Sequence, residues 1–240
     1  MQETSASIPG PASSLDQLRQ LNETAVFKDD RPTRVWRVDD RDGRPWVIKR
    51  FNHPAWRQRG LAAVGQHPVQ RETAWHRRLI EAGLAVSPAF DLGFDDRGRR
   101  YQATPYLGVT LYDLIRRTPA LPATQRHDLA RQAGRLTGQL VAMGVFYRDL
   151  KSSNLVVDAA GTLRLIDAGD CRPTRLVSRQ GIARKMVDRL HRHLRRAGPG
   201  YSFAAVHRTD RVRFIQAMAE TWDATPPPPW WADLEPDAGA

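Results

Sequence analysis

The sequence lacks the features that several classes of protein require. Its 240 residues contain one cysteine, Cys171, which excludes a disulfide within the chain and a zinc site built from several sulfur ligands. No run of eighteen apolar residues is present, so we expect no membrane-spanning helix. The first residues have neither the basic region nor the apolar region of a secretory signal. These absences predict a cytoplasmic protein.

Acidic residues are also in the minority. The chain has 37 Lys and Arg against 26 Asp and Glu, a net charge of +11. Nine basic residues stand between residues 172 and 196 against one acidic residue, Asp188, so this segment carries +8 of that charge. An excess of positive charge favours an anionic partner, such as phosphate, nucleic acid or a lipid surface.

The N-terminal half shows strand patterns followed by a helical pattern. Residues 33–38 alternate in the manner of a strand, residues 40–43 (DRDG) form a turn signal, and residues 46–51 resume as a second strand that contains Lys49. Residues 69–82 then predict a helix on which Glu72 shares the buried face with Trp75 and Leu79.

The C-terminal half is predicted to be mainly helical, with one hairpin. Apolar residues from Leu129 to Met143 recur at spacings of four and three, which predicts a long helix ending at Gly144. Residues 155–157 and 163–166 predict two strands around a turn. Because a hairpin brings its ends together, we expect residues 149–154 to lie beside Asp167.

These patterns predict an α+β fold with two lobes, a small β-rich N-lobe and a mainly helical C-lobe. A strand pattern at residues 100–106 meets Pro105 and Gly108, where a short connection between the lobes is expected. The predicted divisions are a flexible N-terminus (1–14), the N-lobe (15–104), the C-lobe (105–225) and a proline-rich acidic tail (226–240).

Four motifs carry candidate chemistry. Residues 147–154 (YRDLKSSN) resemble the catalytic loop of protein kinases, H-R-D-L-x-x-x-N, with Tyr147 in place of histidine. Residues 167–169 (DAG) resemble the metal-binding D-F-G motif, and residues 47–49 (VIK) resemble V-A-I-K. Glu72 stands on the helix that follows Lys49. The resemblance therefore extends to a bilobal protein-kinase-like fold.

The resemblance implies ATP and Mg²⁺ as cofactors and a role for each residue. Asp149 would orient and deprotonate the acceptor hydroxyl, and Lys151 would neutralise the transferred phosphoryl group. Asn154 and Asp167 would hold magnesium. Lys49 would bind the phosphates, and Glu72 would fix Lys49 in position.

Two departures from the protein-kinase pattern affect substrate binding. Residues 27–35 contain no glycine where protein kinases have G-x-G-x-x-G, so backbone amides approach phosphates less closely there. The side chains of Lys28, Arg31 and Arg34 are candidates for that task, and a solvated hairpin rim is the equal alternative. No A-P-E segment follows Asp167, so a long activation loop has no room and peptides lose their usual platform.

Residues 26–196 resemble the bacterial lipopolysaccharide core kinases, which phosphorylate heptose or Kdo sugars of a glycolipid. The shared features are the Arg-rich first hairpin, the short segment after the metal-binding aspartate and a basic helix at residues 178–196. The resemblance implies an anionic glycolipid acceptor and peripheral association with the inner face of the inner membrane. The apolar stripe of that helix predicts packing in the C-lobe or contact with an anionic membrane.

Other functions remain open at this point. Residues 148–151 (RDLK) are typical of Ser/Thr protein kinases, and a small-molecule kinase of the aminoglycoside or choline type shares the aspartates and the asparagine. A pseudokinase or a basic nucleic-acid-binding protein would use the arginine-rich segment as its working surface. The complete set of candidate catalytic residues favours an enzyme, and we expect no specific nucleic acid partner.

Overall fold

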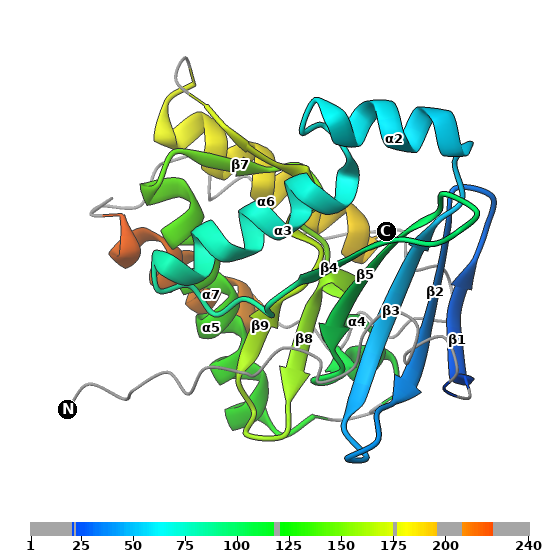
Figure 1. The fold of residues 1–240 in the computed structure, drawn as a ribbon. Coiled ribbons are helices and arrows are strands. Elements are labelled where there is room, and N and C mark those ends of the chain that lie inside the picture. Colours follow the sequence, from blue (N-terminus) through cyan, green and yellow to red (C-terminus); the bar gives the residue numbers. More distant parts are fainter. Residues whose placement is uncertain (1–20, 22, 118–120, 175–176, 196–207, 223–240) are drawn as a thin grey trace. The chain divides into compact units, whose positions relative to one another are not determined.

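The chain forms an α+β structure made of two compact units, Met1–Leu107 and Gly108–Ala240. It is a computed structural model that describes residues 21, 23–117, 121–174, 177–195 and 208–222 (Figure 1). The first unit contains an antiparallel sheet and the second is mainly helical, as predicted. The first unit ends at Leu107, three residues beyond residue 104, where the N-lobe was predicted to end. The predicted flexible segments 1–14 and 226–240 lie outside the described residues.

The first unit is built on a five-stranded antiparallel sheet in the order β1-β2-β3-β5-β4 (Figure 1). The predicted hairpin is confirmed, because residues 33–39 pair with residues 45–51 in continuous register. Gly43 in its turn has φ +74°, a conformation that glycine adopts without strain. The strands are β1 (Glu23–Asp29), β2 (Thr33–Asp39), β3 (Pro45–Phe51), β4 (Phe90–Phe94) and β5 (Arg100–Pro105).

One face of this sheet forms an apolar core. Because side chains alternate along a strand, residues two apart in β2, β3 and β5 point to the same side. The buried members are Trp36, Val38, Trp46, Ile48, Tyr101 and Ala103. Lys49 is the next residue after Ile48 and therefore points to the opposite face.

Two helices complete the first unit, α2 (Ala55–Ala63) and α3 (Pro68–Glu81). The sequence pattern did not predict α2, whereas α3 confirms the helix expected at residues 69–82. Glu72 and Leu79 are buried on α3 as predicted. Trp75 is only half-buried, and His76 is fully buried in its place, because the face packed against the sheet is centred between Glu72 and His76.

The buried side chain of Gln58 ties α2 to the rest of this unit. Its amide nitrogen donates to the carbonyl oxygens of Phe51, at 3.0 Å, and His53, at 2.6 Å. Its amide oxygen accepts from the backbone nitrogen of Arg100 at 3.0 Å and lies 3.3 Å from Nε2 of His67. One buried amide thus fixes α2 against β3, β5 and the start of α3.

His67 caps the N-terminus of α3 with its ring. The backbone nitrogen of Val69 donates to Nδ1 at 3.2 Å, so Nδ1 carries no proton and Nε2–H faces the oxygen of Gln58. Burial, followed by the positive charge of Arg100, lowers the pKa of His67 from 6.5 to about 4. The cap therefore depends on a neutral imidazole.

The second unit is organised around two tightly packed helices, α5 (Ala123–Ala142) and α7 (Arg208–Thr221). α5 confirms the long helix predicted over residues 129–143. Gly134 and Gly138 face α7 so closely that a Cβ atom would lie 2.2 Å from the carbonyl oxygen of Phe214 and 2.5 Å from that of Met218. The absence of a side chain at both glycines is what permits this distance between the helices.

Short strands and turns supply the rest of the second unit. β8 and β9 form the predicted hairpin, and β6 pairs with β8 in the order β6-β8-β9, while β7 pairs with β10. The remaining elements are β6 (Gly108–Thr110), α4 (Leu111–Arg117), β7 (Val145–Tyr147), η1 (Ser152–Asn154), β8 (Leu155–Asp158), β9 (Leu163–Leu165), η2 (Ala168–Asp170), β10 (Cys171–Pro173) and α6 (Arg179–Arg195).

Helix α6 packs into the second unit through its apolar stripe. Ile182 and Met186 are buried and Leu190 is half-buried, which confirms the packing interpretation for this side of the helix. The side chain of Leu194 lies outside the described part of the structure. Arg184, Lys185 and Arg192 are exposed. Within the described ranges, no helix is long and apolar enough to cross a bilayer.

Close packing at Gly134 predicts an unusual response to alanine. Alanine normally stabilises a helix relative to glycine by about 1 kcal/mol. In Gly134→Ala we expect a loss of about 1–3 kcal/mol in the free energy of unfolding, because the new methyl group overlaps the α7 backbone. Gly60→Ala on α2 is the control, since its Cβ would meet nothing within 4 Å. A urea denaturation series in which Gly134→Ala is more stable than Gly60→Ala would contradict the close packing of α5 on α7.

The buried imidazole of His67 predicts a pH-dependent stability. A pKa lowered on folding means that the unfolded chain binds the proton more tightly, so stability is lost as pH falls from 6.5 towards 4. His67→Asn keeps a capping oxygen without a titrating ring. Between pH 7 and pH 4.5 the wild type should lose about 2 kcal/mol more than this variant in urea denaturation. Parallel losses in the two proteins would rule out the lowered pKa of His67.

Candidate functional site

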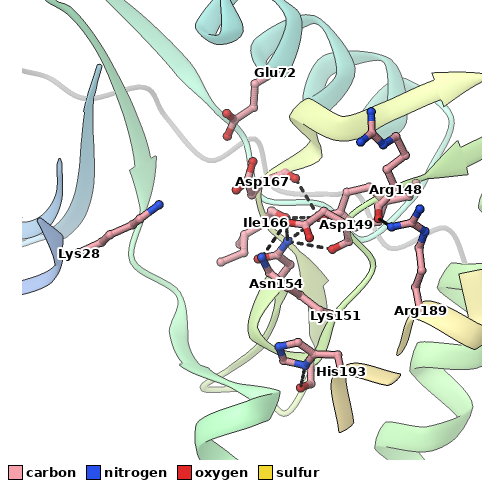
Figure 2. A network of polar contacts seen from close by, with 12 residues as sticks. Lys28, Glu72, Arg148, Asp149, Lys151, Asn154, Ile166, Asp167, Arg189 and His193 are labelled. Atoms are coloured by element: carbon pink, nitrogen blue, oxygen red, sulfur yellow. Dashed lines mark hydrogen bonds and ion pairs between the residues drawn. The ribbon is translucent and has the colours of Figure 1, made fainter. Parts of the chain in front are cut away.

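The hairpin β8–β9 brings two polar segments of the second unit together. The backbone nitrogen of Ile166, just after β9, donates to the carbonyl oxygen of Asn154, just before β8, at 2.9 Å. Asp167 therefore follows directly on a residue bonded to the end of the 149–154 loop (Figure 2). This is the proximity that the hairpin pattern predicted.

The side-chain nitrogen of Asn154 connects the two ends of the loop through its hydrogen bonds (Figure 2). It donates to the hydroxyl of Tyr147 at 2.8 Å, to the backbone oxygen of Asp149 at 3.0 Å and to Oδ2 of Asp149 at 3.0 Å. Because the nitrogen is engaged in this way, Oδ1 is the atom of the amide that points to other partners. No hydrogen bond to Oδ1 occurs among the described residues.

Asp149 and Lys151 form the accessible part of the loop. Nζ of Lys151 donates to Oδ2 of Asp149 at 2.7 Å. The side chains of Asp149 and Lys151 are 38% and 32% exposed, so a molecule approaching from solvent can reach them. Lys151 and Asn154 both bind Oδ2, and no hydrogen bond to Oδ1 of Asp149 occurs in the described part of the chain.

Tyr147 fixes the backbone of Asp167. Its buried hydroxyl donates to the carbonyl oxygen of Asp167 at 2.9 Å. Asp167 has φ +57° and is the one non-glycine residue with positive φ in the described ranges. Such a conformation is uncommon for a residue with a Cβ atom and persists where surrounding bonds impose it.

The tyrosine hydroxyl stays protonated. Burial, and then the negative charge of Asp167, raises the pKa of Tyr147 well above 10. The sequence showed Tyr147 only as a departure from the histidine of the protein-kinase pattern. Its role as a donor to Asp167 needs the tertiary structure, because twenty residues separate the two groups in the chain.

Helix α6 supports the same loop from its other side, a contact that the sequence did not indicate. Nη1 of Arg189 donates to the carbonyl oxygen of Arg148 at 2.9 Å, and Nδ1 of His193 lies 3.3 Å from the hydroxyl of Ser152. Figure 2 shows Arg189 and His193 reaching the loop at separate points. Part of the basic segment therefore positions the loop through its side chains.

In the first unit, Lys49 and Glu72 form the predicted pair. Nζ of Lys49 donates to Oε2 of Glu72 at 2.9 Å, and the glutamate is almost fully buried. Nε2 of His76 lies 3.8 Å from Oε1 of the same glutamate, and Nδ1 of His76 contacts the carbonyl oxygen of Ser87. Glu72 is thus placed between a lysine and a buried histidine, of which the sequence pattern identified only the lysine.

Arg34 occupies a different part of the first unit. It lies on β2, where Nη2 bonds Oε2 of Glu23 at 2.8 Å and Nε lies 3.5 Å from Oδ2 of Asp29. Both carboxylates belong to β1. The structure therefore brings Arg34 to the neighbouring strand rather than to the Lys49–Glu72 pair, and its proposed contact with phosphate stays a prediction.

A cysteine nucleophile and a metal site built from three His, Cys, Asp or Glu side chains are two chemistries that the described residues do not favour. Burial raises the pKa of the Cys171 thiol from 9.0 to about 12, so this sulfur stays protonated and is a poor nucleophile near neutral pH. In the part of the chain that the structure describes, no three His, Cys, Asp or Glu side chains gather closely enough to bind a metal by themselves.

The hydroxyl of Tyr147 yields a prediction for the site. Tyr147→Phe removes the donor to Asp167 and leaves the amide of Asn154 with one partner fewer, so we expect about 1–3 kcal/mol less stability in urea denaturation. Tyr106→Phe is the matched control, because no hydrogen bond of the Tyr106 hydroxyl is present among the described residues. Equal losses in both variants would show that the Tyr147 hydroxyl does not hold the loop.

Comparison with known proteins assigns no family. No protein-family model and no curated protein matches the chain. The resemblance drawn from motifs therefore stays a prediction, and the function is inferred from the arrangement of side chains described above.

Proposed function

We propose that this protein is an ATP- and Mg²⁺-dependent phosphotransferase with a protein-kinase-like fold, acting on a hydroxyl group. The observation that carries the proposal is the network of Asn154, Asp149, Tyr147 and Asp167. In this network the amide nitrogen of Asn154 donates to a carboxylate that solvent can reach, that of Asp149, and to the hydroxyl of Tyr147, which in turn holds the backbone of a second aspartate, Asp167. A pair of acidic residues with different surroundings suits a base and a metal ligand.

Asp149 is the proposed base. The acceptor hydroxyl attacks the γ-phosphorus of ATP, the bond from that phosphorus to the bridging oxygen breaks, and ADP leaves. Oδ1 of Asp149 takes the hydroxyl proton, since Oδ2 is occupied by Asn154 and Lys151. Lys151 carries a positive charge next to this oxygen and would stabilise the negative charge on the transferred phosphoryl group.

Asn154 and Asp167 are the proposed metal ligands. Magnesium is commonly held by one or two protein oxygens together with substrate phosphates, so a cluster of three acidic side chains is not needed. The contacts of the Asn154 nitrogen leave its Oδ1 for a cation. Bound magnesium would neutralise charge on the triphosphate, and the residues of the chain fit that requirement.

Lys49 is the proposed phosphate ligand of the first unit. A lysine ammonium on a flexible stem needs a partner to fix its position, and Glu72 supplies one at 2.9 Å. The burial of Glu72 strengthens this attraction relative to a pair in water. His76 on the opposite side of the carboxylate limits its movement.

The short segment after Asp167 favours a non-peptide acceptor. β10 begins at Cys171 and pairs at once with β7, and α6 begins at Arg179. The hydroxyl of Thr174 bonds the carbonyl oxygen of Gly144 at 3.0 Å, which anchors the chain between these elements. We therefore propose a sugar hydroxyl of a lipopolysaccharide-type glycolipid as the acceptor, met at the inner face of the membrane.

The proposed base is tested by Asp149→Asn. We expect transfer of γ-labelled phosphate from ATP into a bacterial envelope extract, separated into glycolipid and protein fractions, to fall by about a hundred- to ten-thousandfold, because the amide cannot take the hydroxyl proton. Asp128→Asn is the control, as it removes an exposed carboxylate from α5. The thermal transition of each variant verifies that it is folded.

The same assay distinguishes the acceptors. Label in the glycolipid fraction with the wild type alone supports the proposal. Label in the protein fraction would replace the glycolipid with a Ser/Thr substrate. Undiminished transfer by Asp149→Asn would remove Asp149 from the role of base.

A further inference from the structure

Helix α2 presents an apolar stripe to solvent. Trp56 is 78% exposed and Val64, at the C-terminal end of the helix, is 67% exposed. Gly60 and Ala63 are also exposed and follow Trp56 at spacings of four and seven, so the four residues lie along one side of the helix. The indole of Trp56 therefore does not belong to the apolar core that stabilises this unit.

Arginines flank this stripe on both sides. Arg57 and Arg59 are exposed, and on a helical projection they lie on opposite sides of Trp56. Neither makes an ion pair with any residue in the ranges that the structure describes. Their charges therefore face solvent, where an anionic partner can meet them.

The turn between β4 and β5 adds a third arginine. A Cβ atom on Gly98 would lie 2.5 Å from Cβ of Ala55 and 3.7 Å from Nε of Arg59, so this turn packs against the start of α2. Arg97, the preceding residue, is exposed. Its neighbour Asp96 is exposed as well and places one negative charge beside it.

The inner side of α2 is held rigidly. The four contacts of Gln58 fix the helix to β3, β5 and α3 without using any residue of the outer stripe. Figure 1 shows α2 as a separate helix that follows the end of β3. The outer surface is therefore presented in one orientation, which lowers the entropy lost on binding.

We propose that this outer surface of α2, comprising Trp56, Val64, Arg57, Arg59 and Arg97, binds the surface of an anionic lipid bilayer. Tryptophan partitions into the boundary between head groups and acyl chains, where its ring is apolar and its N–H meets water. Arginines beside it meet the negative head groups. A nucleic acid would use the arginines but offers no apolar layer for Val64.

This inference deepens the proposed function, on which it rests for the membrane location of the acceptor, and it assigns the membrane contact to residues outside the phosphotransfer network. Each arginine near an anionic bilayer contributes about a fivefold increase in affinity, and one indole adds an apolar contact. Together they give a reversible attachment rather than permanent anchoring. The protein would exchange between membrane and solution without a lipid modification.

The test is co-sedimentation of the full chain with vesicles. Vesicles of phosphatidylglycerol and phosphatidylcholine are compared with vesicles of phosphatidylcholine alone. We expect binding to the anionic vesicles only, and a loss of roughly twentyfold in Arg57→Gln/Arg59→Gln, about fivefold for each charge. Trp56→Ala should weaken binding by at least about fivefold as well. Salt should weaken the arginine contribution and spare that of Trp56.

Two control variants distinguish binding through α2 from binding through a second basic surface and from catalysis. Arg184→Gln/Arg192→Gln removes the same charge from the exposed side of α6 and should change binding by less than about twofold. Asp149→Asn should bind vesicles like the wild type, so that failure of phosphotransfer and failure of membrane binding are distinguishable.

Several results would overturn the proposal. These are no binding by the wild type, equal binding to both kinds of vesicle, or a greater loss from the α6 variant than from the α2 variant. Binding to DNA that is lost in Arg57→Gln/Arg59→Gln, without binding to vesicles, would assign the surface to nucleic acid instead.

Discussion

The amide nitrogen of Asn154 is the contact on which the candidate site depends. It bonds the hydroxyl of Tyr147 and two oxygens of Asp149, so it joins the beginning of the loop to its end. Tyr147 extends the connection to the carbonyl oxygen of Asp167, whose left-handed backbone it helps to maintain. The raised pKa of Tyr147 keeps its hydroxyl able to donate. A change at any of these groups affects the others, because buried polar groups that lose a partner are costly.

The first unit uses buried polar side chains in a comparable way. Gln58 connects three elements of the sheet and helices, and the neutral ring of His67 caps α3 only while it is unprotonated. Because α3 carries Glu72, the cap and the proposed partner of Lys49 belong to the same helix. Correct placement of the glutamate thus depends on polar contacts some distance away from it.

The sequence by itself determined the local elements and the order of the candidate residues. Alternation at residues 33–51 and the periodicity of residues 69–82 and 129–143 indicated β2, β3, α3 and most of α5, because each depends on a pattern within a short stretch. The hairpin at residues 155–166 was enough to predict that Asp167 lies near Asn154. Glu72 was likewise placed on the buried face of its helix.

Only the tertiary structure decided what these residues touch. β1, α2 and α7 were missed. Every residue of β1 is exposed and the strand is held by pairing with β2, whereas α7 packs on glycines of α5. Four further features depend on residues from separate elements. They are the burial of His76, the hydrogen bonds donated by Arg189 and Tyr147, and the ion pair of Arg34 with β1. Such contacts arise when the chain folds back on itself, and no periodicity along the sequence encodes them.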